Sequence, residues 1–332
     1  MPPTTRLSVC TLSFLVLLAA LTSSFAQGPA ARPQVCISGF YDLYLHPDEW
    51  QKTRPMIDSV IVADHSINAR YTDAQLKTMF DDLNNWNIKF TLEVGAVKPW
   101  GPTGAKCFVA NSPKWDRFQR LGAHISAIAM DEPLVCARYN LKLSDDYAVQ
   151  ETAAFIALVR QHYPQILVGD IETYPSTSVD DHFKWITALN ARLASLGVRG
   201  LDFYRIDTNW AVFTLANKGT WRDVVKIEQY CRSIKLPFSL IYWAAEYPAI
   251  DRVHLAADDT WYEAIFQQGY DYALCGGAPD EYCIESWLHN HAPGPTPVNV
   301  VPDTSDFTFT RSVHDFVGKF VEARTATPGA QH

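Results

Sequence analysis

The stretch ISAIAMDEP, Ile125 to Pro133, indicates the fold of this chain. An uncharged apolar run ends abruptly in two carboxylates and a proline, which is typical of a buried strand that delivers Asp131 and Glu132 to an exposed rim. Seven other strand-like runs have the same character, and several close on acidic or aromatic residues, in YDLY, VADH, TLEV, GDIE, WAAE and IESW. Acidic strand ends gathered on one face predict a parallel α/β barrel with its chemistry at the carboxyl ends of the strands.

Strand-like and helical patterns alternate along the chain without a linker or repeat. The expected strands are Val35–Leu45, Asp58–Ser66, Ile88–Val94, the run from Ile125, Ile166–Glu172, Leu201–Ile206, Leu236–Glu246 and Glu281–Trp287. Thr72, Ser144 and Ser178 are expected to cap helices, and Gly95–Lys106 is expected to form a loop over the rim. A doubly wound open sheet is the competing architecture, but Gly39 is not part of a glycine-rich phosphate loop. We predict a single (β/α)8 barrel.

The amino terminus has the pattern of a secretory signal. Arg6 precedes an apolar run from Leu7 to Leu21, and Ser24 and Ala26 supply the small residues that a signal peptidase needs. A membrane anchor needs about 20 apolar residues, more than this run offers. We predict a signal peptide at residues 1–26, a barrel domain at residues 27–332, and a secreted or periplasmic protein whose mature form has no membrane partner.

The amino-acid composition and net charge limit the classes of molecule that this protein is expected to bind. Hydrophobic residues make up 48% of the chain and charged residues 19%, as in a globular protein with a sizeable core. The formal net charge of −8 argues against nucleic acid or an anionic membrane and is compatible with a neutral substrate. No HExxH or CxxC spacing occurs, and the HxH spacing of His289 and His291 falls in an expected proline-rich loop rather than on a strand. No metal site and no cofactor are therefore expected.

Cysteine number and location suggest disulfides. The chain has seven cysteines, and removal of Cys10 with the signal would leave an even number in an oxidising compartment. Cys107 and Cys136 fall just beyond the third and fourth expected strands, so two neighbouring rim loops would be tied together. We therefore predict a disulfide between Cys107 and Cys136.

The expected rim is rich in carboxylates and aromatic side chains. Its members are Tyr41, Asp64, His65, Glu93, Asp131, Glu132, Asp170, Glu172, Asp202, Tyr204, Trp243, Glu246, Glu285 and Trp287. Crowded carboxylates repel, so some have raised pKa values, and two carboxyl groups with different pKa values are what glycoside hydrolysis requires. Aromatic residues form 13% of the chain and suit sugar binding. A metal-dependent hydrolase and a non-catalytic carbohydrate-binding barrel remain alternatives.

The pattern resembles the retaining glycoside hydrolases of clan A. In that clan the acid/base glutamate follows strand four, commonly within Asn-Glu-Pro, and the nucleophilic glutamate ends strand seven. Here Asp131-Glu132-Pro133 ends the fourth expected strand, Glu246 ends the seventh, and Trp287 is similar to the tryptophan that often follows strand eight. Asp131 replaces the asparagine that typically contacts the sugar 2-hydroxyl.

The resemblance implies a secreted hydrolase of poly- or oligosaccharides. It assigns Glu132 as acid/base and Glu246 as nucleophile. The expected substrate-binding residues are Tyr41, Asp64, Glu93, Asp131, Glu172, Tyr204, Trp243, Glu285 and Trp287. The aspartate at position 131 leaves open that Asp131 is itself the acid, and Glu172 and Glu285 are reserve candidates for catalysis.

Overall fold

The computed structural model describes residues 32–210, 212, 218–244, 258–286 and 299–323. Within these residues, parallel strands β1 to β8 follow one another in chain order, and β8 pairs with β1 to close the barrel. The chain is therefore a single (β/α)8 barrel, as predicted from its sequence. The expected signal peptide at residues 1–26 lies outside the described residues and stays a prediction.

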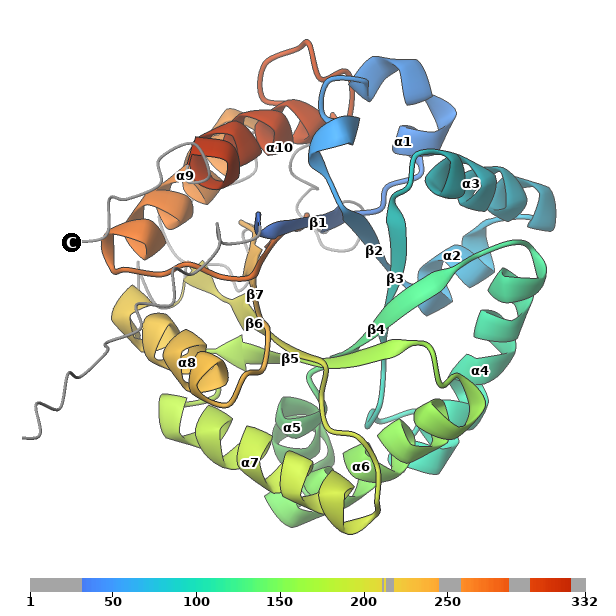
Figure 1. Cartoon of the computed structure of the whole chain (residues 1–332), viewed down its shortest axis with the longest axis vertical. Coiled ribbons are helices and arrows are strands. Elements are labelled where there is room, and N and C mark those ends of the chain that lie inside the picture. The colour runs from blue at the N-terminus through green and yellow to red at the C-terminus, as the bar shows by residue number, and fades with distance from the viewer. Residues whose placement is uncertain (1–31, 211, 213–217, 245–257, 287–298, 324–332) are drawn as a thin grey trace, which may run out of the picture. The chain divides into compact units, whose positions relative to one another are not determined.

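The strands form the inner wall and the helices surround it (Figure 1). The strands are β1 Gln34–Ser38, β2 Ser59–Ala63, β3 Lys89–Val94, β4 Ile125–Asp131, β5 Leu167–Tyr174, β6 Phe203–Thr208, β7 Phe238–Tyr242 and β8 Glu281–Ile284. The α-helices are α1 Asp42–Leu45, α2 Asp64–Arg70, α3 Asp73–Asn85, α4 Gly104–Arg120, α5 Pro133–Val135, α6 Asp145–His162, α7 Val179–Ser195, α8 Trp221–Ser233, α9 Asp258–Leu274 and α10 Phe309–Val317. Short 3-10 turns are η1 Pro47–Trp50 and η2 Arg54–Met56, and π-helical turns are η3 Cys136–Leu141 and η5 Gly318–Glu322.

The predicted helix caps are confirmed. The Thr72 side chain accepts a hydrogen bond from the Gln75 amide, and the Gln75 side chain accepts one from the Thr72 amide, which completes a capping box. The side chains of Ser144 and Ser178 likewise accept hydrogen bonds from backbone amides at the starts of α6 and α7. These caps satisfy amide groups that would otherwise lack an intrahelical partner.

Several predicted boundaries are wrong: the seventh and eighth strands end at Tyr242 and Ile284, and three other boundaries run into the helix that follows. The first strand ends at Ser38 rather than Leu45, and the second at Ala63 rather than Ser66, because helices α1 and α2 begin soon after the strands leave the barrel. The expected loop to Lys106 is also too long. Helix α4 begins at Gly104, where the Thr103 side chain caps it by accepting from the Lys106 amide. These errors misplace the ends of strands and of one loop, but they do not change the order of the elements.

A small cluster of buried side chains marks the interior of the barrel. It contains residues of the strands and Trp243, which directly follows β7. Its buried members are Cys36, Ile61, Ala129, Ile171, Ile241, Trp243 and Cys283. Their sequence neighbours within the strands pack instead with residues of the helices in the larger core. Because side chains alternate along a strand, every second residue counted from this cluster faces the interior.

The cysteines differ from the prediction. Cys36, Cys107, Cys136, Cys231, Cys275 and Cys283 are all free thiols, so the predicted disulfide between Cys107 and Cys136 is not formed. Cys107 belongs to helix α4 rather than to a rim loop, and its Sγ donates a hydrogen bond of 2.9 Å to the Gly101 carbonyl oxygen. The early start of α4 is thus the physical reason for the error.

No helix among the residues that the structure describes is long and apolar enough to cross a membrane.

Candidate active site

Four carboxylates lie on the interior face at or near the carboxyl ends of their strands. They are Glu93 on β3, Asp131 on β4, Asp207 on β6 and Glu285 directly after β8. Glu93, for example, is the register neighbour of Ala129, which belongs to the interior cluster. Strand alternation therefore brings four acidic groups to one end of the barrel, where βα loops form active sites in this fold.

Glu132, the predicted acid, follows Asp131 in an unusual backbone conformation. Its φ and ψ are 49° and 52°, in the left-handed region, and it precedes Pro133. Such a conformation costs about 1–3 kcal/mol for a residue other than glycine, and such residues cluster at functional sites. Burial and the neighbouring Asp131 carboxylate raise the pKa of Glu132 to about 7, while Lys98 acts in the opposite direction. Glu132 therefore exchanges a proton near neutral pH.

The other carboxylates influence one another across the barrel mouth. Burial, followed by repulsion from Asp131 and Glu285, raises the pKa of Glu93 well above its usual range. Burial likewise raises the pKa of Asp207, and repulsion from the Glu132 and Glu285 carboxylates raises it further. The groups thus form one acidic cluster, in which a single added proton or ligand changes the ionisation of the rest.

Two cations balance part of this charge. Lys98, in the loop after β3, places Nζ 2.5 Å from an Asp131 carboxylate oxygen. Burial acts to lower the pKa of Lys98, but the hydrogen bond and charge of Asp131 together with the Glu132 and Cys136 contributions outweigh it, and the pKa is raised. Arg205 is buried deeper in the barrel, where its Nη2 lies 2.5 Å from a Glu281 oxygen. Burial raises the pKa of Glu285, whereas the Arg205 charge lowers it.

Trp243 contacts the cluster, and further aromatic side chains lie in the loops that follow β1 and β3. The indole Nε1 of Trp243 donates a hydrogen bond to the Asp207 carboxylate, so Trp243 orients that carboxylate. Tyr41 stacks on Tyr71 with ring centroids 4.3 Å apart, in the loop region that follows β1. Trp100, in the loop after β3, is 58% exposed. An exposed indole of this kind suits contact with a sugar ring.

Three expected substrate-binding residues point away from the interior. Asp64 is buried and accepts hydrogen bonds from Lys114 (2.9 Å) and Trp115 (3.0 Å) of α4. The Tyr204 hydroxyl lies 2.7 Å from His182 Nδ1 of α7. Glu172, between inward-facing neighbours on β5, accepts hydrogen bonds from the backbone of α5. The structure therefore gives these three side chains contacts with helices rather than a place in the acidic cluster.

Two predicted residues, Glu246 and Trp287, lie outside the described residues, so their assignments stay predictions. Sequence reasoning missed Asp207 and Lys98 as members of the site. A signal for Asp207 existed, because FYRIDT alternates in strand fashion and places Asp207 on the same face as Phe203 and Arg205. Lys98 carried no such signal, since it belongs to an irregular loop.

The described residues contain no group of side chains suited to binding a metal ion. No three His, Cys, Asp or Glu side chains in that part of the chain are arranged to hold a metal ion. The expectation of metal-free catalysis stays a prediction.

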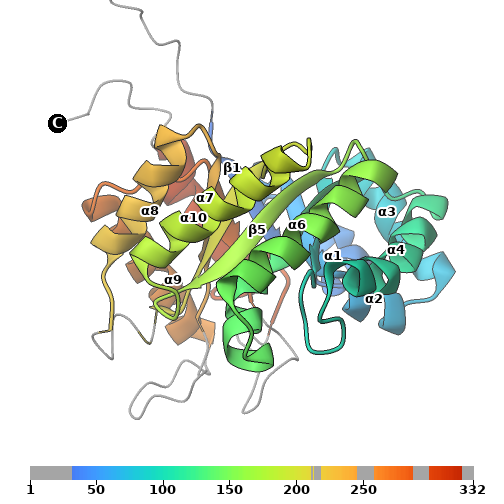
Figure 2. The same cartoon turned by 90° about the horizontal axis from the view of Figure 1, so that it is seen from below.

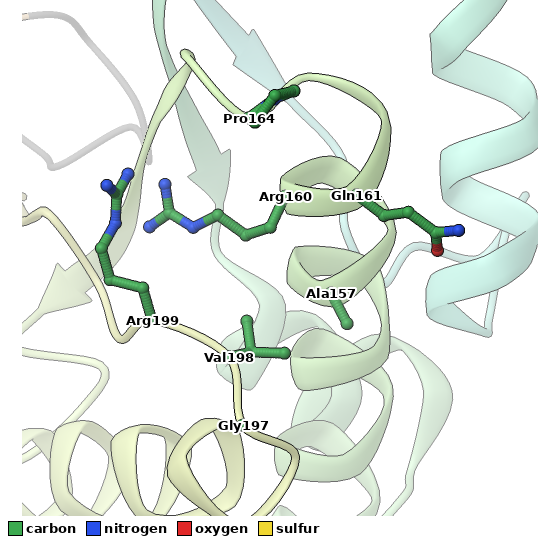
Figure 3. A pocket seen from close by; sticks show the side chains of 7 residues that line it. All are labelled: Ala157, Arg160, Gln161, Pro164, Gly197, Val198 and Arg199. Carbon is green, nitrogen blue, oxygen red and sulfur yellow. The ribbon is translucent and has the colours of Figure 1, made fainter.

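A separate hollow lies between the end of α6 and the residues after α7, near the amino ends of the strands (Figure 3). Arg160 and Arg199 extend into the region shown, and both pair with Asp202, at 2.7 and 3.1 Å. Arg160 also donates to the backbone carbonyls of Ile166 and Gly200. These contacts join α6 to the following segments, so we interpret the hollow as structural.

Comparisons with known proteins support the fold. No protein-family model matches the chain, and no curated protein matches it. A thermostable mutant of the xylanase Xyn10A from Cellvibrio japonicus is 9% identical, with a TM-score of 0.52 over 80% of this chain and 91% of that one. Native xylanase 10C from the same organism is 10% identical, with a TM-score of 0.50 over 77% of this chain and 61% of that one.

A D-psicose 3-epimerase crystallised with D-fructose is also similar, with 12% identity and a TM-score of 0.50 over 87% of this chain and 99% of that one. These neighbours are barrel enzymes that include two xylanases and an epimerase, and identity this low shows the fold alone. The chain is thus a (β/α)8-barrel protein with an acidic cluster at the mouth of its barrel.

Proposed function

We propose that this protein is a glycoside hydrolase that cleaves a poly- or oligosaccharide with two carboxyl groups. One observation carries the proposal: Glu132 directly follows β4 in a left-handed conformation, with a pKa of about 7, among other carboxylates. A carboxyl group that titrates near neutral pH can protonate the leaving glycosidic oxygen, while an ionised carboxylate serves as nucleophile or base. The xylanase neighbours make a carbohydrate reaction plausible on this fold.

In this proposal Glu132 is the general acid/base and Glu246 the nucleophile. Asp207 and Glu285 are the described alternatives for the second role, because both belong to the acidic cluster. Glu93, Asp131, Trp243 and Tyr41 are proposed to contact substrate, and Trp287 keeps its predicted sugar contact. The proposed setting is secreted or periplasmic, on the basis of the amino-terminal sequence alone.

Activity should depend on the protonation of Glu132. Because its pKa is raised to about 7, kcat/KM is expected to fall about tenfold per pH unit above pH 7 as the acid loses its proton. Initial rates between pH 5 and pH 9 measure this decrease in kcat/KM, which is the alkaline limb of the pH–rate profile. The same limb should be absent from a Glu132→Gln variant assayed on a glycoside with a good leaving group. A wild-type rate that stays level up to pH 9 would contradict the assignment.

Hydrolysis of a polysaccharide panel, with and without a chelator, tests the function itself. We expect reducing ends to appear at the same rate in both conditions, since carboxyl groups act by proton transfer and covalent attack. Loss of activity with chelator and recovery with a divalent ion would favour a metal-dependent hydrolase. Binding of an oligosaccharide without any hydrolysis would favour a non-catalytic barrel.

A further inference from the structure

Glu172 is a buried carboxyl group that the proposed mechanism does not use. It lies on β5 with none of its surface exposed, on the face directed toward the helices. Its Oε1 accepts a hydrogen bond of 2.6 Å from the Leu134 amide, and its Oε2 accepts a weaker one of 3.4 Å from the Val135 amide. Both amides belong to α5, the short helix that begins directly after Glu132 and packs beside β5 (Figure 1).

Backbone contacts tie the same turn to β5. The Glu132 amide donates a hydrogen bond of 2.9 Å to the Ile171 carbonyl oxygen, and the Glu132 carbonyl accepts one of 2.9 Å from the Cys136 amide. Two consecutive residues of β5, Ile171 by its backbone and Glu172 by its side chain, therefore hold the turn that carries Glu132. Figure 2 shows β5 with α6 and α7 beside it, so the strand is itself firmly packed.

The turn needs such support because its conformation is unfavourable by itself. Glu132 is left-handed, a region that residues other than glycine avoid, and the following proline disfavours helical conformations at Glu132 as well. Pro133 has no amide hydrogen, so the amides of Leu134 and Val135 are the first free donors of the helix. A carboxyl group offers two oxygen acceptors to these two donors.

We propose that Glu172 is a positioning residue, which keeps Glu132 directed into the barrel mouth by holding the amides of Leu134 and Val135. This inference rests on the proposed function only where it treats Glu132 as the proton donor. Glu172 is fully buried, so we do not expect it to contact substrate. Its loss should therefore weaken proton donation rather than the fold or the binding of sugar.

Asp170 provides a matched control. It lies two residues earlier on β5, on the same outward face, and is also fully buried. Its Oδ2 accepts a hydrogen bond of 2.6 Å from Trp185 Nε1 of α7 and does not hold the turn at Glu132. Asp170→Leu and Glu172→Met both remove a buried carboxyl group from one face of one strand, but only Glu172→Met releases the turn.

The test compares two glycosides of one sugar, one with a poor leaving group and one with a good leaving group. Glu172→Met is expected to lower kcat/KM about 10²-fold on the poor leaving group, as for a displaced catalytic group, and less than about threefold on the good one. Glu172→Gln keeps an oxygen for the Leu134 amide and should recover at least about tenfold of the loss. Asp170→Leu should change both substrates by less than about threefold.

Equal losses on both substrates, or no loss in Glu172→Met, would overturn the inference. If Glu172→Met does not fold, Glu172→Asp applies the same comparison, because its shorter carboxylate withdraws from the turn; a loss confined to the poor leaving group supports the inference. If the wild type cleaves neither glycoside, the proposed function is wrong. A crystal structure of Glu172→Met, or of Glu172→Asp if Glu172→Met does not fold, then decides the positioning role, which an unmoved turn at residues 132–135 overturns and a displaced turn supports.

Discussion

Replacing Glu132 by Ala is expected to lower kcat/KM on a natural polysaccharide about 10²- to 10⁴-fold, the range that a general acid contributes. Glycosides whose leaving groups need no proton should keep a near-normal first step. Added azide should then rescue the second step, since a small anion can attack the covalent intermediate without a general base. A glycosyl azide of retained configuration, identified by NMR, is the expected product.

The control for Glu132 is a carboxylate removed from an exposed helix position, Asp146→Ala at the start of α6. It should keep full activity on both kinds of substrate. Near-normal hydrolysis of polysaccharide by Glu132→Ala would show that another group supplies the proton. Asp131 would then be the first candidate, because it adjoins Glu132 and contacts Lys98.

Replacing Glu246 by Ala is expected to reduce turnover about 10⁴-fold or more, as removal of a nucleophile does in other enzymes, without loss of the fold or of substrate binding. Without this carboxylate no covalent intermediate forms, so activated and natural substrates should lose activity alike. Single-turnover kinetics measure the chemical step, and calorimetry with an oligosaccharide measures binding. This response differs in kind from that of Glu132→Ala.

Asp207→Asn and Glu285→Gln are the matched variants for this test. Both keep side-chain size, and both sites lie in the acidic cluster, where Asp207 bonds to Trp243 and Glu285 accepts from Cys283. We expect each of them to weaken activity by less than Glu246→Ala. If one of them abolishes turnover while Glu246→Ala remains active, that residue is the nucleophile, and the assignment to strand seven is wrong.

Local sequence features were sufficient to predict the barrel. Apolar periodicity and caps such as Thr72, Ser144 and Ser178 act within one or two turns of the chain, so they are visible without knowledge of the fold. The same signals cannot tell where a strand leaves the barrel wall. The run from Val35 to Leu45 remained apolar across the change from β1 to α1, which is why its end was misplaced.

The acidic character of the rim was also predictable, but the direction of each side chain was only partly so. Neighbours on a strand face opposite sides, so Asp131 and Asp207 enter the mouth whereas Glu172 and Tyr204 face the helices. Phe203, Arg205 and Asp207 are alternate residues of one strand, so Asp207 could have been predicted to share the face of Phe203. Choosing which face of each strand is interior requires the register of the closed sheet, because only pairing with both neighbours fixes it.

By itself, the sequence determined the order of elements, the caps and the presence of carboxylates at strand ends, because those depend on neighbouring residues. The tertiary structure alone decided the contacts that tune Glu132. Lys98 reaches Asp131 from 33 residues away, and Glu172 holds Leu134 from 38 residues away. Such contacts arise only when neighbouring strands pair and their following turns meet, so no local pattern within either segment encodes them.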